Sequence, residues 1–176
     1  NVTITIWASD GTDNSTEETF TLTVNPIQDD PEIYYKNLEG NDITYTSTIN
    51  QDGTSFTGNN TLYSFDYDTM VGGKFRVRPI AGSWSDISNG STLNLDYGTF
   101  QFGAFGTSDN IGYQAFTYTV DDYLDLDITS GDVTDSFEFQ AIDSNLNPSD
   151  IQTYTITIRP VDFSPIINSI YTSGLG

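Results

Sequence analysis

The sequence has no histidine and no cysteine, and only five lysine and arginine residues stand against 25 aspartate and glutamate residues. Without cysteine there are no disulfides and no thiol chemistry, and without histidine the common zinc sites are excluded as well. Carboxylates then remain as the plausible metal ligands, and they favour the hard cations calcium and magnesium. The formal charge of −20 argues against nucleic acid and anionic membranes as partners, because clustered lysine and arginine bind both.

Long apolar runs and amphipathic helical patterns are missing too. No stretch approaches the roughly 20 apolar residues of a membrane-spanning helix, so we expect no membrane insertion. The first residues do not resemble a signal peptide, and we expect the chain to be a fragment of a longer one. Serine has no histidine partner, neither lysine lies in a recognisable catalytic motif, and the acidic residues fall in turns. We therefore expect no enzymatic activity.

The sequence does contain apolar and polar residues that alternate with a period of two. The clearest runs are residues 2–7, 19–24, 74–78, 100–102, 116–120, 136–140 and 154–158. Such alternation predicts half-buried β-strands, with apolar side chains facing a core and threonine facing water. Asp-Gly, Asn-Gly and Gly-Gly pairs between the runs predict turns. Together these patterns predict an all-β, antiparallel β-sandwich.

Two segments of the sequence resemble each other. Residues 3–31 and residues 136–165 both read as a strand, a loop with the pattern Ala-x-Asp, a second strand and a short linker that ends in proline. The distance between the two prolines is that of a full sandwich domain, so the chain contains an internal repeat. We predict the C-terminal hairpin of a preceding repeat over 1–26, a complete domain over 27–161, and the linker and start of a following repeat over 162–176.

Short acidic patterns lie in the loops between the predicted strands. The linker that precedes the domain reads IQDDP and contains Asp29 and Asp30. The other patterns, in chain order, are Glu39 in NLEGND, Asp66 and Asp68 in FDYD, Asp125 and Asp127 in YLDLD, Asp143 in AIDS, and Asp162 in PVDFSP. Neighbouring carboxylates repel each other unless a positive charge compensates them, so we expect a cation at these positions.

In their order along the chain, these patterns resemble those of the cadherin-like repeats of extracellular adhesion proteins, especially the long bacterial versions. The IQDDP linker is similar to the V-N-D-x-P linker of that family, and YLDLD is similar to its L-D-x-E element, with aspartate in place of glutamate. The resemblance implies a cadherin- or immunoglobulin-like Greek-key sandwich at the cell surface, with Ca²⁺ bound where successive repeats join. It also implies that the main partners are adjacent repeats of the same chain.

The acidic residues divide into two groups, because the chain enters such a sandwich at one end and leaves it at the other. We call these ends the N-terminal pole and the C-terminal pole. The predicted ligands at the N-terminal pole are Asp29, Asp30, Asp66, Asp68 and Asp143, and those at the C-terminal pole are Glu39, Asp125, Asp127 and Asp162. Each group offers part of the about six to eight oxygens that Ca²⁺ takes. The second linker has phenylalanine and serine in place of the paired aspartates, so it offers fewer ligands.

Other interpretations stay open. Acidic residues in so negative a chain are mostly solvated, and aspartate often forms turns through its own side chain, as we expect for Asp96. The first functional hypothesis is a structural or adhesive repeat, rigidified by calcium, that projects, spaces or joins surfaces. The second is a building block of a self-assembling filament, sheath or surface layer, which contacts other copies through strand edges. The third is a module that binds surface glycans through exposed aromatic residues and calcium.

Overall fold

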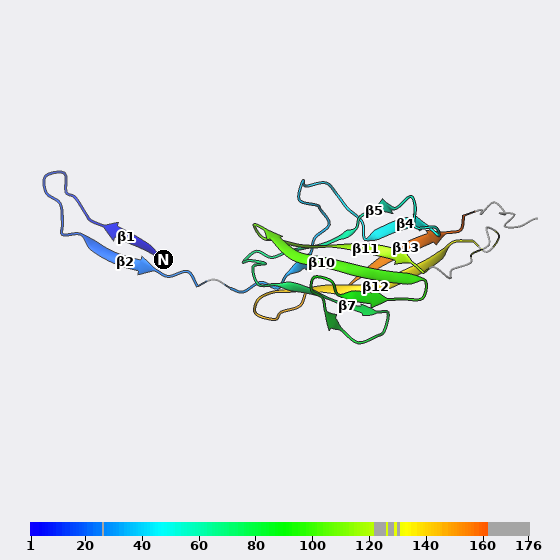
Figure 1. The fold of residues 1–176 in the computed structure, drawn as a ribbon. Helices are drawn as coiled ribbons and strands as arrows, with labels where there is room; N and C mark the ends of the chain where they lie inside the picture. The colour runs from blue at the N-terminus through cyan, green and yellow to red at the C-terminus, as the bar shows by residue number, and fades with distance from the viewer. Residues whose placement is uncertain (26, 122–125, 127–128, 130, 162–176) are drawn as a thin grey trace, which may run out of the picture.

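The structure is a computed structural model that describes residues 1–25, 27–121, 126, 129 and 131–161. Every regular element in these ranges is a β-strand. No helix in the described part of the chain is long and apolar enough to cross a membrane. The strands form a two-stranded hairpin near the N-terminus and a sandwich of two larger sheets (Figure 1).

The N-terminal hairpin consists of β1 (Val2–Ile6) and β2 (Glu18–Leu22), which pair antiparallel. Neither strand is hydrogen-bonded into one of the two larger sheets of the described structure. Figure 1 shows the hairpin apart from the sandwich, at the far end of an extended linker. The hairpin thus receives no strand neighbour from the rest of the described chain.

The sandwich contains a five-stranded and a six-stranded sheet. The first sheet has the order β3 (Glu32–Ile33), β6 (Thr61–Phe65), β11 (Ile111–Val120), β10 (Gly98–Ser108) and β9 (Thr92–Asn94). The second has the order β5 (Thr57–Gly58), β4 (Thr46–Asn50), β13 (Gln152–Arg159), β12 (Val133–Ile142), β7 (Lys74–Pro79) and β8 (Ser85–Asp86). The predicted all-β sandwich is confirmed. Its sheets are antiparallel except where β4 pairs parallel with β13.

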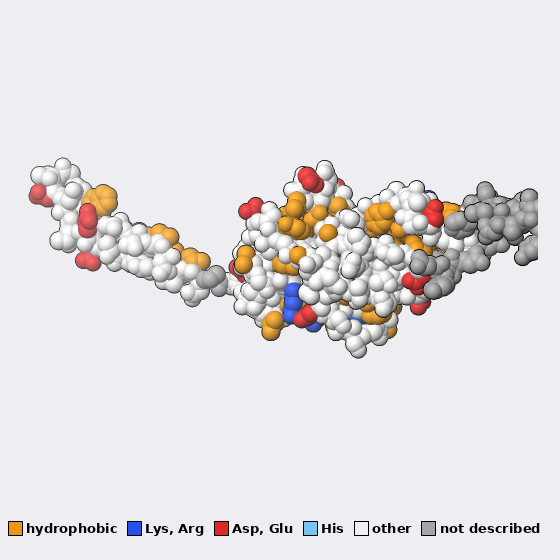
Figure 2. Space-filling view, viewed as in Figure 1, with side chains coloured by type: hydrophobic (Ala, Val, Ile, Leu, Met, Phe, Trp, Pro, Cys, Tyr) orange, Lys and Arg blue, Asp and Glu red, His pale blue; other side chains and the backbone are white. Residues whose placement is uncertain are grey.

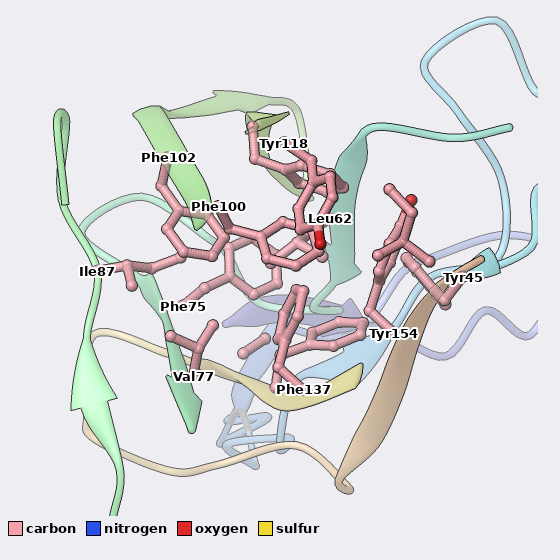
Figure 3. Packing of buried hydrophobic residues seen from close by; sticks show 14 of the residues in the cluster. Tyr45, Leu62, Phe75, Val77, Ile87, Phe100, Phe102, Tyr118, Phe137 and Tyr154 are labelled. Carbon is pink, nitrogen blue, oxygen red and sulfur yellow. The ribbon is translucent and has the colours of Figure 1, made fainter. Parts of the chain in front are cut away.

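The core lies between the two sheets and is rich in aromatic side chains. On β13 the side chains of Tyr154, Ile156 and Ile158 are fully buried, whereas the threonines between them are partly exposed. Phe100 of the first sheet meets Phe137 of the second edge-on, with ring centroids 4.8 Å apart (Figure 3). Such aromatic pairs contribute about 0.5–1.5 kcal/mol each beyond the burial of their area. The apolar residues that alternate in the sequence are therefore the side chains that pack in the core.

The outer strands of both sheets are short. The edge strands β3 and β5 have two residues each, as does β8, and β9 has three. Long strands, such as β10 with 11 residues and β11 with 10, lie inside the sheets. Short edges expose few unpaired backbone groups, which opposes edge-to-edge pairing with other chains.

Candidate cation site at the N-terminal pole

The linker in front of the sandwich is hydrogen-bonded to two loops at the N-terminal pole. The backbone N–H of Asp29 donates to Asp68 Oδ2 at 3.0 Å, and Gln28 Nε2 donates to Asp143 Oδ2 at 3.2 Å. Pro31, which ends the linker, is buried. The structure thus brings Asp29, Asp68 and Asp143 to one pole, through loops that lie far apart in the sequence.

Asp143 is held by hydrogen bonds from neutral donors. Its side chain is 2% exposed and lies in the loop between β12 and β13. Oδ1 accepts the backbone N–H groups of Asn145 at 2.9 Å and Asn147 at 2.7 Å, and Oδ2 accepts Asn147 Nδ2 at 3.0 Å as well as the Gln28 amide. This is the turn-forming use of aspartate, in which the side chain satisfies nearby backbone donors.

Asp66 has the unusual environment at this pole. It directly follows β6 and is 0% exposed. Its Oδ1 accepts the backbone N–H of Asp68 at 2.7 Å, but its Oδ2 is buried and has no hydrogen-bond partner among the residues that the structure describes. None of the four ion pairs found among the described residues includes Asp66. A buried carboxylate oxygen without a donor or a cation costs free energy, so this atom is where a cation would be most stabilising.

A cleft of about 540 Å³ lies beside the linker. Its lining includes the carboxylate residues Asp29, Asp30, Glu32 and Asp150, and the aromatic residues Tyr35 and Tyr67. Figure 2 shows acidic side chains at this end of the sandwich, next to the linker. Four carboxylates around one concave surface make it attractive to cations. Asp30 lines this cleft, so it lies at the same pole as Asp29.

The carboxylates of the N-terminal pole do not form a finished coordination shell. Within the described ranges, no three acidic side chains meet in an arrangement that could hold a metal ion. Asp29 contacts Asp68 through its backbone rather than through its carboxylate. The donor set nevertheless suits calcium, because it consists of carboxylate oxygens and one of them, on Asp66, is buried and unsatisfied. Asp66 and Asp68 would hold the ion from the loop, and Asp29 or Asp30 from the linker.

The C-terminal pole is described only in part. Asp125, Asp127 and Asp162 lie outside the described residues. Glu39 is exposed and lies in the loop between β3 and β4, where its backbone N–H donates to Asn37 Oδ1 at 3.1 Å. Glu39 thus lies outside the first strand of the domain, β3, which ends at Ile33. The ligand group at this pole stays a prediction.

A buried acid pair near the start of β12 is absent from the sequence-based prediction. The Tyr118 hydroxyl donates to Asp135 Oδ2 at 2.6 Å, and the Tyr97 backbone N–H donates to the same atom at 3.2 Å. Burial raises the pKa of Asp135, and burial also raises the pKa of Tyr118. The sequence held one signal, because Asp135 precedes Phe137 and Phe139 at the same period of two and so occupies an inward position.

Comparison with protein-family models and with curated protein sequences found no match. A functional assignment therefore depends on the chain's own residues and on how the fold arranges them.

Proposed function

We propose that the chain is a non-enzymatic structural or adhesive repeat of an extracellular surface protein, with a linker stiffened by calcium. The observation that carries this proposal is the buried Asp66 Oδ2, which has no hydrogen-bond partner within the described part of the chain. Asp66 lies in the loop to which the linker is hydrogen-bonded. A divalent ion at that position would satisfy the orphaned oxygen and join the loop to the linker. The sandwich would then be held at a fixed angle to the unit that precedes it.

Electrostatics support the same interpretation. The chain carries a formal charge of −20, and repulsion among its carboxylates opposes the compact state. Each bound calcium would add two positive charges at the pole where Asp29, Asp30, Glu32 and Asp150 surround one cleft. Oxygen sites of extracellular modules bind calcium with dissociation constants of about 0.1–1 mM. Such affinity suits an extracellular location, where calcium is abundant.

Calorimetric titration of the 176-residue chain with calcium tests the proposal. We expect saturable binding in the submillimolar to millimolar range, and loss of that binding when Asp66 is replaced by asparagine. X-ray scattering of the same samples should show a narrower distribution of hairpin-to-sandwich distances with calcium than with chelator. Absence of both binding and a scattering change at about 5 mM calcium would contradict the proposal, since this exceeds the affinities expected for extracellular modules.

Glycan binding is a second candidate, because the cleft at the N-terminal pole exposes two tyrosines. Tyr35 is 50% exposed and Tyr67 is 66% exposed, and both line the cleft with the acidic residues. By contrast, the Trp84 ring is covered by the guanidinium groups of Arg76 and Arg78, at 4.9 and 4.4 Å. We expect any glycan bound on an array to be lost when both tyrosines are replaced by alanine. The Trp84→Ala variant is the control and should keep it.

Self-assembly into a filament, sheath or surface layer is the third candidate. The short edge strands of the sandwich give it little support, because edge pairing needs longer runs of open backbone groups. Electron microscopy of concentrated protein separates the alternatives. Ordered polymers would favour self-assembly, and a monomer at all concentrations would favour the structural or adhesive repeat.

A further inference from the structure

The N-terminal hairpin leaves one apolar face uncovered. Its register pairs Val2 with Leu22 and Ile4 with Phe20, so these side chains share a face with Ile6, while threonines occupy the other face. Val2 is 55% exposed, and Phe20 and Leu22 are each 52% exposed. An isolated two-stranded hairpin is at best marginally stable in water. This face therefore requires a cover that the described chain does not supply.

The sandwich contains a second hairpin of the same pattern whose apolar face is covered. In β12 and β13, Phe137 pairs with Tyr154, and both side chains are fully buried against the opposite sheet. Sequence alignment on the Ala-x-Asp loops and the prolines matches Ile4 with Phe137 and Phe20 with Tyr154. The free edges of this hairpin are also filled, because β12 pairs antiparallel with β7 and β13 pairs parallel with β4.

The loops that join the strands of the two hairpins have matching hydrogen bonds. In the first loop, Ser15 N–H donates to the Ala8 carbonyl at 2.8 Å, and Ala8 N–H donates to Ser15 Oγ at 2.9 Å. In the second loop, Ser149 N–H donates to the Ala141 carbonyl at 2.9 Å, and Ala141 N–H donates to Ser149 Oγ at 3.0 Å. The same reciprocal clasp thus closes both loops, although the second is one residue longer.

The aspartates of the Ala-x-Asp patterns also match. Asp10 Oδ1 and Asp143 Oδ1 each accept two backbone N–H groups from the residues that follow. The donors are Thr12 and Asp13 in the first loop, and Asn145 and Asn147 in the second. Face pattern, loop clasp and aspartate turn coincide, so the two hairpins are the same kind of structural unit.

We infer that β1 and β2 are the last two strands of a second sandwich of the same kind, and that the opposite sheet of that sandwich covers their apolar face. The free edge of β1 would pair antiparallel with a strand equivalent to β7, and that of β2 would pair parallel with a strand equivalent to β4. This inference rests on the proposed role as a structural repeat, but it does not depend on calcium.

A second copy of the described chain is a poorer occupant. The place that this hairpin would take in a sandwich is already filled in each copy by β12 and β13. Two hairpins packed face to face would bring together chains that each carry a charge of −20. In a sandwich body that still needs its last hairpin, by contrast, that place is open.

Thiol reactivity tests the inference, because the chain has no cysteine of its own. Ile4→Cys places a thiol on the apolar face, and Thr3→Cys places the matched control on the other face. In the 176-residue chain, we expect both thiols to react at similar rates. The second protein repeats residues 27–133 directly before Asn1, which supplies the missing strands in the aligned register. In this fusion, the thiol of Ile4→Cys should react at least about tenfold more slowly than that of Thr3→Cys. The reason is that the hairpin must first separate from the sheet that covers it before the thiol is exposed.

Thiol reactivity of both proteins is measured in calcium and in chelator. Failure of this inference can then be distinguished from failure of the calcium proposal. Ile6 is smaller than its counterpart Phe139, so a second fusion carrying Ile6→Phe guards against poor packing. Equal reactivity of the two thiols in both fusions would overturn the inference. It would also be overturned if the Ile4→Cys thiol of the 176-residue chain were already protected in a monomer. Protection that grows with protein concentration would assign the face to a second copy instead.

Discussion

The backbone N–H of Asp29 donates a hydrogen bond of 3.0 Å to Asp68 Oδ2, so the carboxylate of a loop holds the linker against the sandwich. Asp68 in turn donates its own N–H to Asp66, whose second oxygen is buried and has no partner in the described ranges. The linker therefore contacts the same loop that contains the unpaired Asp66 oxygen. Any ion that binds Asp66 and Asp68 acts on the same contact that orients the linker.

Calcium removal is expected to destabilise the chain. An ion that binds the folded state alone stabilises it by about 2.7 kcal/mol at a free concentration of 100 times its dissociation constant. Calorimetric unfolding in calcium, in magnesium and in chelator measures the effect. Calcium should raise the melting temperature more than magnesium does, because magnesium demands stricter octahedral geometry. Identical melting curves in all three buffers would exclude a calcium site.

The effect of Asp66→Asn on the free energy of unfolding should have opposite signs in chelator and in calcium. In chelator, the variant should match or exceed the wild type in stability, because it removes a buried charge that lacks a cation. In calcium, it should be the less stable protein, since the ion loses its buried ligand. Urea unfolding in both buffers measures the difference, with the exposed Asp96→Asn as the matched control. An equal loss in both buffers would make Asp66 a purely structural residue.

The sequence predicted the strands that alternate clearly and missed those that do not. The runs at 116–120 and 154–158 lie in β11 and β13. One face of each strand is buried and the other is more exposed to solvent, so apolar and polar residues alternate along it. By contrast, β6 buries Leu62, Tyr63 and Ser64 in succession, and so shows no period of two. The strand β4 is rich in serine and threonine, and its place is set by its neighbour β13. Tertiary contacts, which no local pattern reports, decided both cases.

The sequence could assign Asp29, Asp68 and Asp143 to one pole, but it could not give the partners of their side chains. Alternation and loop order place Asp66, Asp68 and Asp143 at the end of the sandwich where the linker arrives. Whether a carboxylate stabilises a turn or is free to bind a cation depends on which hydrogen-bond donors reach its oxygens. Asp143 accepts hydrogen bonds on both oxygens, whereas Asp66 does so on one. That difference arises from loop conformation, which short acidic motifs do not encode.

The stability of this chain should come from the sandwich and not from the hairpin. Phe137→Ala removes a fully buried ring at the centre of the aromatic core, and we expect a loss of about 3–5 kcal/mol in the free energy of unfolding. Phe20→Ala makes the same chemical change on the exposed face of the hairpin, where we expect a change within about 0.5 kcal/mol. Urea denaturation measures both. A large effect of Phe20→Ala would show that the hairpin is packed in this chain.

Leu146 stores backbone strain in the Asp143 loop. Its φ of 72° is left-handed, a conformation that costs a leucine about 1–2 kcal/mol, and its side chain is 71% exposed. Leu146→Asn should therefore raise the free energy of unfolding by about 1 kcal/mol, because asparagine tolerates this conformation and little packing is lost. The exposed Leu38, whose φ is not positive, gives the control variant Leu38→Asn. If both substitutions changed stability equally, strain at position 146 would be ruled out.

The buried pair of Tyr118 and Asp135 should make stability depend on pH. Burial raises the pKa of Asp135 above its ordinary value of 3.8, so the folded chain holds this proton more tightly than the unfolded chain does. The contribution of this group to the free energy of unfolding is therefore full below that value, and it is lost as the pH rises through the raised pKa. Asp135→Asn carries no charge at any pH and keeps an oxygen for the Tyr118 hydroxyl.

The measurement is urea unfolding of the wild type and Asp135→Asn in chelator, at several pH values from about 3.5 to 7. Subtracting the two curves removes the general effect of the −20 charge, which both proteins share to within one unit. We expect the variant to gain stability relative to the wild type as the pH rises. Tyr118→Phe should lose about 1–3 kcal/mol, because it leaves the buried Asp135 Oδ2 without its hydroxyl partner. A difference between the wild type and Asp135→Asn that did not change with pH would mean that Asp135 titrates alike in the folded and unfolded chains.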